Sequence, residues 1–99
     1  MTKYRQYFLE MCEQNQALFD AFQPIHDGYK LDRKQWSQRF HAEGQKVVDV
    51  MRDWEQRLCA GMEKSKNSVY SSKLAEKFWE EVKKRFSHIE LVGVRSNLD

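Results

Sequence analysis

One long apolar stripe constrains the fold of this chain more than any other feature of its sequence. Large apolar side chains recur three or four positions apart over about 30 residues, which is the spacing of one face of an α-helix. The residues of this stripe are Trp36, Phe40, Val47, Met51, Trp54, Leu58 and Met62. At 1.5 Å per residue, such a helix would be about 45–50 Å long. In a chain of 99 residues, the remainder suffices for two shorter helices of about 21 residues each.

The N-terminal segment predicts a first helix over about residues 2–23. Its apolar positions, at helical spacing, are Tyr4, Phe8, Met11, Leu18 and Phe22. Asn15 takes one position of this stripe, which is typical of a polar core residue that sets register. Pro24 cannot continue the backbone hydrogen-bond ladder, so the helix should end near it. Asp27 and Gly28 then predict a turn.

The middle helix is predicted over about residues 32–65. Asp32 and Gln35 form the pattern of a capping box at its start. A serine- and asparagine-rich stretch then marks a break in the chain, and a third helix is predicted over about residues 69–90. Residues 91–99 are expected to form a tail.

These segments predict an all-α fold with a single helical domain over residues 1–99. Because short connections favour antiparallel neighbours, we expect a three-helix up-down-up antiparallel bundle with a long middle helix. A closed bundle of this kind cannot cover the surplus turns of its middle helix. Either that helix bends, at Gly44 or Gly61, or a second copy of the chain covers its end. The simpler cover is a second copy, so the sequence predicts a homodimer.

Composition and charge exclude several classes of protein. The net charge is +2, from 17 basic and 15 acidic side chains that are interspersed along the chain, so the chain is not a polycation. Cys12 and Cys59 do not form a CxxC motif and are expected to be buried thiols in a reducing compartment. The N-terminus lacks the apolar region of a signal peptide, and no run approaches the ~18 apolar residues of a membrane span. We therefore expect a cytoplasmic protein without membrane contact.

The sequence contains no pattern that is typical of catalysis. It has no GxSxG motif, no Cys–His signature and no glycine-rich phosphate loop. We therefore expect no enzymatic activity and no cofactor.

The three histidines give the only combination that could suggest a metal site. In an up-down-up bundle, His26 and His88 should lie near each other, with His41 about two turns along the middle helix. No HxxxH or HxxE pair lies on one helix. Solvated or capping histidines are therefore favoured over metal ligands.

Gly44 lies where the long stripe requires a large side chain. A glycine within a helix costs about 1 kcal/mol relative to alanine, so its presence needs a reason. We favour a close helix–helix crossing that leaves no room for a Cβ. The alternatives are a kink and a ligand cavity beside the missing side chain.

Two clusters of cations are expected to meet at one end of the bundle as an anion-binding surface. They are Lys30, Arg33 and Lys34 near the first connection, and Lys83, Lys84 and Arg85 near the end of the third helix. Cations at a helix C-terminus interact favourably with the helix dipole, whereas cations at a helix start do not. Tyr29 and Trp36 lie close to the first cluster, and Asp32 offsets part of its charge.

The leading hypothesis is a non-enzymatic helical protein–protein interaction module that self-associates and docks a protein partner. Its expected partner-binding residues are exposed side chains of the middle helix, namely Trp36, Phe40, Trp54 and Met62. One alternative is a small nucleic-acid-associated regulatory protein that uses the basic end. Another is a small-ligand-binding helical bundle with its cavity at Gly44.

Overall fold

The computed structural model describes residues 2–63 and 69–94, with side chains described over 2–60 and 73–94. Four helices, followed by a short 3-10 turn, are present in this described part of the chain. They are α1 (Lys3–Gln14), α2 (Gln16–Leu31), α3 (Arg33–Glu63), α4 (Val69–Arg85) and the turn η1 (Ile89–Leu91). No strand occurs in these residues, and the predicted all-α class is confirmed.

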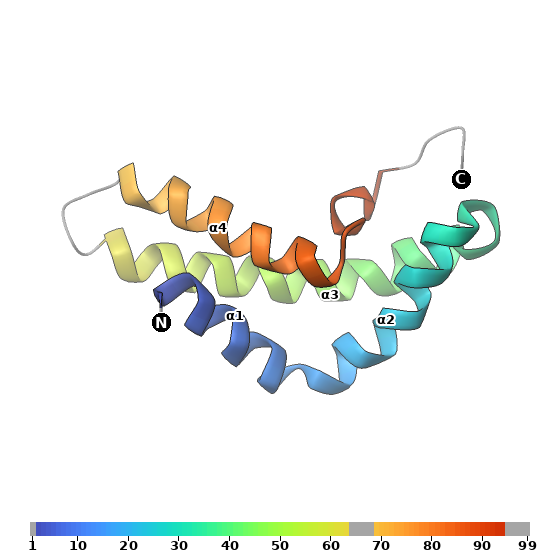
Figure 1. Cartoon of the computed structure of the whole chain (residues 1–99), viewed down its shortest axis with the longest axis horizontal. Coiled ribbons are helices and arrows are strands. Elements are labelled where there is room, and N and C mark those ends of the chain that lie inside the picture. Colours follow the sequence, from blue (N-terminus) through green and yellow to red (C-terminus); the bar gives the residue numbers. More distant parts are fainter. Residues whose placement is uncertain (1, 64–68, 95–99) are drawn as a thin grey trace.

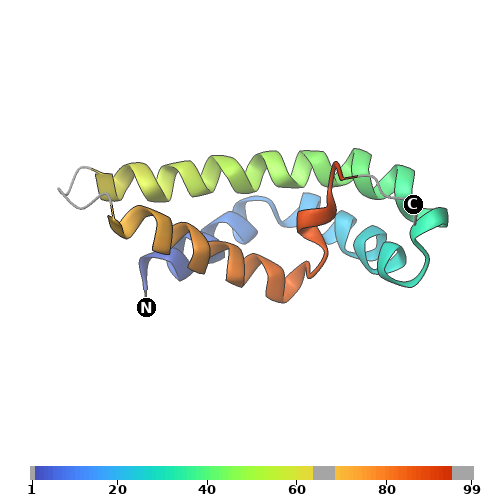
Figure 2. The ribbon, with the colours of Figure 1, turned by 90° about the horizontal axis from the view of Figure 1, so that it is seen from above.

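The long helix α3 forms the axis of a molecule that measures 47 × 27 × 18 Å. Helices α1 and α2 follow one another along α3, and α4 and η1 follow one another along it on another side (Figure 1). Viewed from above, α3 lies along one edge and the other helices lie together beside it (Figure 2). Among the described helices, none combines the length and apolarity that a bilayer span requires.

The prediction of one helix over about residues 2–23 is wrong. The chain forms two helices there, and the second continues past Pro24 to Leu31. The break lies at Asn15, which has φ −123° and ψ 29° and whose Nδ2 donates to the carbonyl oxygen of Met11 at 3.0 Å. Asn15 is thus a helix-end residue, and both its backbone N–H and its side-chain amide donate to the carbonyl oxygen of Met11 in the last turn of α1. The predicted three-helix count is therefore wrong, because two helices, α1 and α2, take the place of the single predicted first helix. We call α1 and α2 together the first arm.

Helix α2 continues through Pro24 and through the predicted turn at Asp27 and Gly28. A proline within a helix removes one backbone hydrogen bond. The ring of Pro24 is exposed, whereas Phe22, His26 and Tyr29 are buried on the inner side of the same helix. We infer that burial of this face maintains the helix past the proline.

A single residue, Asp32, connects α2 to α3. Its Oδ1 accepts a hydrogen bond from the backbone N–H of Gln35 at 3.2 Å, which confirms the predicted start of the middle helix. A Cβ added to Gly28 would overlap the ring of Trp36. Gly28 therefore allows the backbone of α2 to lie directly against a side chain of α3.

Helix α3 passes through Gly44 without interruption. A Cβ at Gly44 would lie 2.7 Å from Cγ2 of Val92 and 3.2 Å from Cζ of Phe22. The predicted close approach at Gly44 is confirmed, although its partners are a side chain of α2 and the segment after η1. Val92 fills the space beside Gly44, so the alternative of a ligand cavity there is wrong.

The first arm and the last arm, which consists of α4 and η1, together cover the whole length of α3. The ring of Phe22 in α2 meets the ring of Phe86, the residue directly after α4, in the core, with the ring centroids 5.4 Å apart. Near the other end of α3, Tyr7 of α1 packs edge-on against Trp54 at 6.1 Å. The bend at Asn15 lets both helices of the first arm lie along α3 (Figure 1). The surplus turns that motivated a homodimer are thus covered within one chain.

The third predicted helix is too long at its C-terminal end. Helix α4 ends at Arg85 rather than near residue 90, and η1 follows after a break at Phe86. Phe86 and Ile89 are both buried, and the break allows the chain to turn across α3 between them. Of the predicted tail, Leu91 and Val92 pack against the core, Val94 is exposed, and residues 95–99 lie outside the described part of the chain.

Candidate functional site

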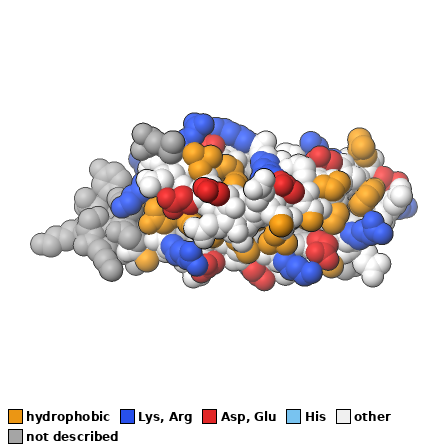
Figure 3. Space-filling model, turned by 90° about the horizontal axis from the view of Figure 1, so that it is seen from below, with side chains coloured by type: hydrophobic (Ala, Val, Ile, Leu, Met, Phe, Trp, Pro, Cys, Tyr) orange, Lys and Arg blue, Asp and Glu red, His pale blue; other side chains and the backbone are white. Residues whose placement is uncertain are grey.

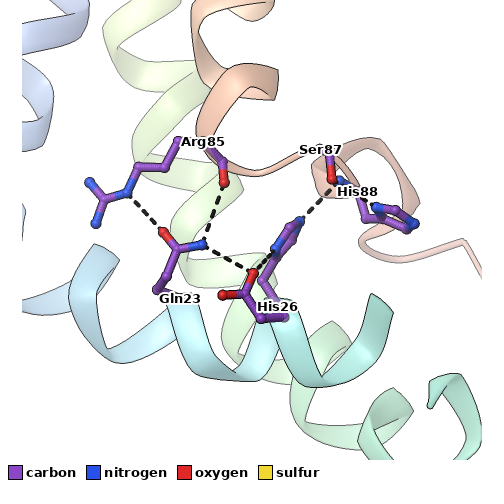
Figure 4. A network of polar contacts seen from close by, with 6 residues as sticks. Gln23, His26, Arg85, Ser87 and His88 are labelled. Atoms are coloured by element: carbon purple, nitrogen blue, oxygen red, sulfur yellow. Dashed lines mark hydrogen bonds and ion pairs between the residues drawn. The ribbon is translucent and has the colours of Figure 1, made fainter. Parts of the chain in front are cut away.

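His26 is a buried histidine that joins α2 to the chain after α4. Its side chain is 1% exposed. Its Nδ1 lies 3.1 Å from Oδ1 of Asp27, and its Nε2 lies 3.0 Å from the backbone nitrogen of His88. Figure 4 shows these contacts in one view. The backbone N–H of His88 can only donate, so Nε2 of His26 accepts and the ring proton is on Nδ1.

The surroundings of His26 favour its neutral form. Burial lowers the pKa of His26, and the hydrogen bond with Asp27 only partly opposes this effect. The same hydrogen bond from His26 lowers the pKa of Asp27. Burial also lowers the pKa of His88, with smaller contributions from the charges of His26 and Arg33. The prediction that His26 and His88 are neighbours is confirmed, with ring centroids 5.8 Å apart.

His41 forms a second contact of the same kind. It is 7% exposed, and its Nδ1 accepts the backbone N–H of Gly93 at 2.9 Å. Gly93 has φ +82°, a conformation that glycine adopts without the steric cost of a Cβ. Nε2 of His26 on α2 and Nδ1 of His41 on α3 therefore both accept backbone N–H groups from the segment that follows α4.

Arg85 fixes the end of α4 to α2. Its guanidinium donates through Nε to Oε1 of Gln23 at 3.0 Å and through Nη2 to Oδ1 of Asp20 at 2.9 Å. Gln23 donates in return to the carbonyl oxygen of Arg85 at 3.4 Å (Figure 4). The guanidinium also lies 5.0 Å from the ring centroid of Phe86. Arg85 is therefore a structural cation rather than a free anion ligand.

The two predicted cation clusters do not meet at one end. Helix α4 ends past the middle of α3 but before the connection between α2 and α3 is reached (Figure 1). The cations of the second cluster also have carboxylate partners. These ion pairs are Lys83–Glu90 at 3.1 Å, Lys84–Glu81 at 3.1 Å and Arg85–Asp20 at 2.9 Å.

The first cluster forms a distinct surface, which we call the basic corner. It consists of Lys30, Leu31, Arg33, Lys34, Trp36 and Arg39. Among the described residues, its four cations form no ion pair with a carboxylate. Arg33 lies 5.5 Å from the ring centroid of Tyr29, and Arg39 lies 5.7 Å from that of Trp36.

The most exposed large apolar side chain of the described residues lies in this corner. Leu31 is 90% exposed. A hollow of about 290 Å³ lies nearby, lined by Gln35, Trp36 and Arg39. Sequence reasoning missed Leu31 and Arg39. A signal for Leu31 existed, because it directly precedes the cap Asp32 and belongs to neither apolar stripe.

Two of the four predicted partner-binding residues are not on the surface. Phe40 is 0% exposed and Trp54 is 6% exposed, so the expectation that they are exposed is wrong. Tyr29 of α2 covers Phe40, and Tyr7 of α1 packs against Trp54. Trp36 remains partly exposed in the basic corner, and the side chain of Met62 lies outside the described part of the chain.

Other surfaces of the molecule show weaker signals. A hollow of about 310 Å³ between α3 and η1 is lined by Val48, Arg52, Trp79, Ile89, Glu90 and Val92. On the face seen from below, basic, acidic and hydrophobic side chains are interspersed (Figure 3). Within residues 2–60 and 73–94, no three His, Cys, Asp or Glu side chains are grouped so that they could hold a metal ion.

Comparisons of the chain with protein-family models, with curated protein sequences and with solved structures give no match.

Proposed function

We propose that this chain is a non-enzymatic helical interaction module that docks an acidic protein segment on its basic corner. The observation that carries the proposal is Leu31, which is 90% exposed at the connection between α2 and α3, where Lys30, Arg33 and Lys34 form no ion pair with a carboxylate of the described residues. An exposed leucine gains free energy when a partner removes it from water. The surrounding cations select a partner with carboxylates beside its apolar residue.

The side chains of the basic corner suit carboxylate recognition. Arginine presents a planar fork of donors that matches a carboxylate, and Arg33 and Arg39 both contribute such a fork. Tryptophan and arginine are also enriched among the residues that dominate binding energy at protein interfaces. Trp36 lines the hollow of about 290 Å³ and offers an apolar surface against which a side chain of a partner can pack.

The backbone of the basic corner is already ordered. Asp32 caps α3, the rings of Tyr29 and Phe40 are stacked, and Trp36 packs against Gly28. Little conformational entropy is therefore lost at this surface when a partner binds, which favours affinity.

A nucleic-acid partner is the second candidate, and it is supported by the four cations alone. Several features oppose it. Tyr29 is buried and cannot stack on a base, and one side of Trp36 lies against Gly28. Asp27 and Asp32 reduce the local positive charge, and an exposed leucine makes no favourable contact with phosphate.

The test is a fluorescence titration with labelled synthetic peptides. In these peptides leucine and glutamate residues follow one another three or four positions apart, so that both lie along one face of a helix. The same peptides with lysine in place of glutamate, and a single-stranded oligonucleotide, serve as comparison ligands. Leu31→Asp should weaken binding of the acidic peptide by about tenfold or more. The matched control is Lys83→Gln with Lys84→Gln, which changes two cations outside the corner and should have little effect.

Two results would overturn the proposal. One is equal binding of the glutamate and lysine peptides. The other is acidic-peptide binding that does not change in the Leu31→Asp variant. Strong oligonucleotide binding that is insensitive to Leu31 would instead support the second candidate.

Self-association remains a separate prediction from the sequence. Light scattering on a sizing column should give twice the chain mass of 12.0 kDa if the chain is a homodimer. A single-chain mass across dilution would contradict the dimer and leave the basic corner as a docking surface of one chain.

A further inference from the structure

Residues 87–94, which we call the C-terminal segment, cross α3 after the end of α4 (Figure 1). Two backbone N–H groups of this segment donate to imidazole nitrogens, His88 to His26 and Gly93 to His41. The acceptors belong to two different helices, α2 and α3. Both imidazoles are buried, so water does not readily replace them as partners of these N–H groups.

Each of these two contacts requires a neutral imidazole. A protonated histidine carries a proton on both ring nitrogens and has no acceptor. On protonation, Nε2–H of His26 would face the N–H of His88, and Nδ1–H of His41 would face the N–H of Gly93. Protonation therefore converts each hydrogen bond into two opposed donors.

The groups around His26 do not remove this conflict. Asp27 and Lys30 approach His26 from α2, and His88 approaches it from the C-terminal segment. The carboxylate of Asp27 contacts Nδ1, whereas the conflict arises at Nε2. Arg33 of α3 adds positive charge near His88.

His41 is packed against aromatic rings. Tyr29 of α2 lies edge-on to it at 5.8 Å, and the neighbouring Phe40 lies at 5.2 Å. These rings limit the access of water to the hydrogen bond between His41 and Gly93.

The C-terminal segment covers apolar parts of the helices. Ile89 is buried in the core, and Leu91 and Val92 pack against it. The methyl groups of Val92 lie over Gly44, next to the ring of Phe22. Separation of the segment would therefore uncover an apolar strip on α2 and α3.

We propose that the C-terminal segment is a pH-sensitive cover, which separates from α2 and α3 when the buried His26, whose Nε2 accepts the His88 N–H, takes up a proton. An exposed histidine titrates near pH 6.5. In the closed form burial lowers the pKa of His26, so the open form binds protons more readily. The closed form is consequently favoured above about pH 6.5, and opening becomes more favourable as the pH falls below that value.

The test is hydrogen exchange, read residue by residue with NMR at about pH 7.5 and about pH 5.5 and corrected for the intrinsic exchange rate. Protection of the His88 and Gly93 amides should fall by about tenfold more than that of the Val47 and Met51 amides in α3. If the α3 amides lose protection in parallel, the segment does not open separately and the proposal is overturned.

Substitutions that keep the acceptor but cannot titrate provide the decisive comparison. In His26→Gln an amide oxygen replaces Nε2, and in His41→Asn an amide oxygen replaces Nδ1. The double variant should lose the excess pH response of the segment. His88→Gln is the matched control, because the side chain of His88 is not one of the two acceptors, and it should keep that response.

A measurement on the unaltered chain covers the case in which the double variant fails to fold. The imidazole resonances of His26 should shift over the same pH range in which the His88 and Gly93 amides lose protection. Imidazole titration without loss of protection would overturn the proposal, as would loss of protection without imidazole titration. An undiminished pH response in a folded double variant would overturn it too.

Discussion

The ring of Tyr29 in α2 is stacked on the ring of Phe40 in α3, with centroids 3.8 Å apart and 5° between the ring planes. Both side chains are buried. An aromatic pair of this kind contributes about 0.5–1.5 kcal/mol beyond the area that it buries. Because only Asp32 separates the two helices, this stack holds the basic corner in a fixed shape.

Gly28→Ala should destabilise the protein by about 1–3 kcal/mol, because the new methyl group would overlap the ring of Trp36. At an exposed helical position, the same change would stabilise by about 1 kcal/mol. Urea unfolding followed by circular dichroism measures the difference. In a Trp36→Leu background the penalty should shrink, and an unchanged penalty there would contradict this explanation.

Gly44→Leu should destabilise by about 1–3 kcal/mol through overpacking against Val92 and Phe22. Val92→Ala should relieve part of this loss, because it removes the methyl groups nearest to the new side chain. Ala42→Gly, at an exposed position of the same helix, calibrates the helix-propensity contribution at about 1 kcal/mol. Thermal melts of Gly44→Leu, Val92→Ala, the double variant that combines them, and Ala42→Gly would separate these effects, and a neutral Gly44→Leu would show that the contact is loose.

Arg85→Lys should destabilise by about 1–2 kcal/mol, because lysine cannot donate to Gln23 and Asp20 with a planar fork. The adjacent Lys84→Ala is the control. Its ion pair with Glu81 joins two positions of the same helix, and the side chain of Lys84 is 70% exposed, so its loss should cost about 0–1 kcal/mol. Equal losses for the two variants in urea unfolding would contradict the structural role of Arg85.

The free energy of unfolding should fall as the pH decreases below about 6.5. Burial lowers the pKa of His26 in the folded protein, so the unfolded chain binds a proton at a higher pH than the folded chain does. Stability from this group is complete above the unfolded pKa and is lost as pH falls toward the folded pKa. Urea titrations at several pH values should show a smaller dependence for His26→Gln, and an identical dependence would rule out His26 as its source.

The sequence predicted the helical class and the extent of the middle helix because both depend on periodic patterns. The stripe from Trp36 onward and the cap at Asp32 are local signals, and they correspond to α3 and its start. Pro24 and Asn15 were misread because their roles depend on tertiary contacts. Phe22 and Tyr29 are buried on either side of the proline, and the first arm must bend at Asn15 to follow α3.

The functional surfaces were harder to predict than the fold. An apolar residue at helical spacing can face either the core or a partner, so the sequence alone could not separate buried Phe40 and Trp54 from partly exposed Trp36. The proximity of His26 and His88 followed from topology and was predicted. Their hydrogen bond was not, because it involves a backbone N–H after an unexpected helix end.

The single-residue connection at Asp32 has a consequence for the order in which the chain folds. Tyr29 and Phe40 are close in sequence, whereas the contact between His26 and His88 spans 62 positions. Closing the longer loop costs about 1–2 kcal/mol more in chain entropy. We therefore expect the α2–α3 hairpin to belong to the folding nucleus and residues 87–94 to dock after the rate-limiting step. Phe40→Leu should then mainly slow folding, while Ile89→Val should mainly speed unfolding, and the reverse pattern in stopped-flow kinetics would contradict this order.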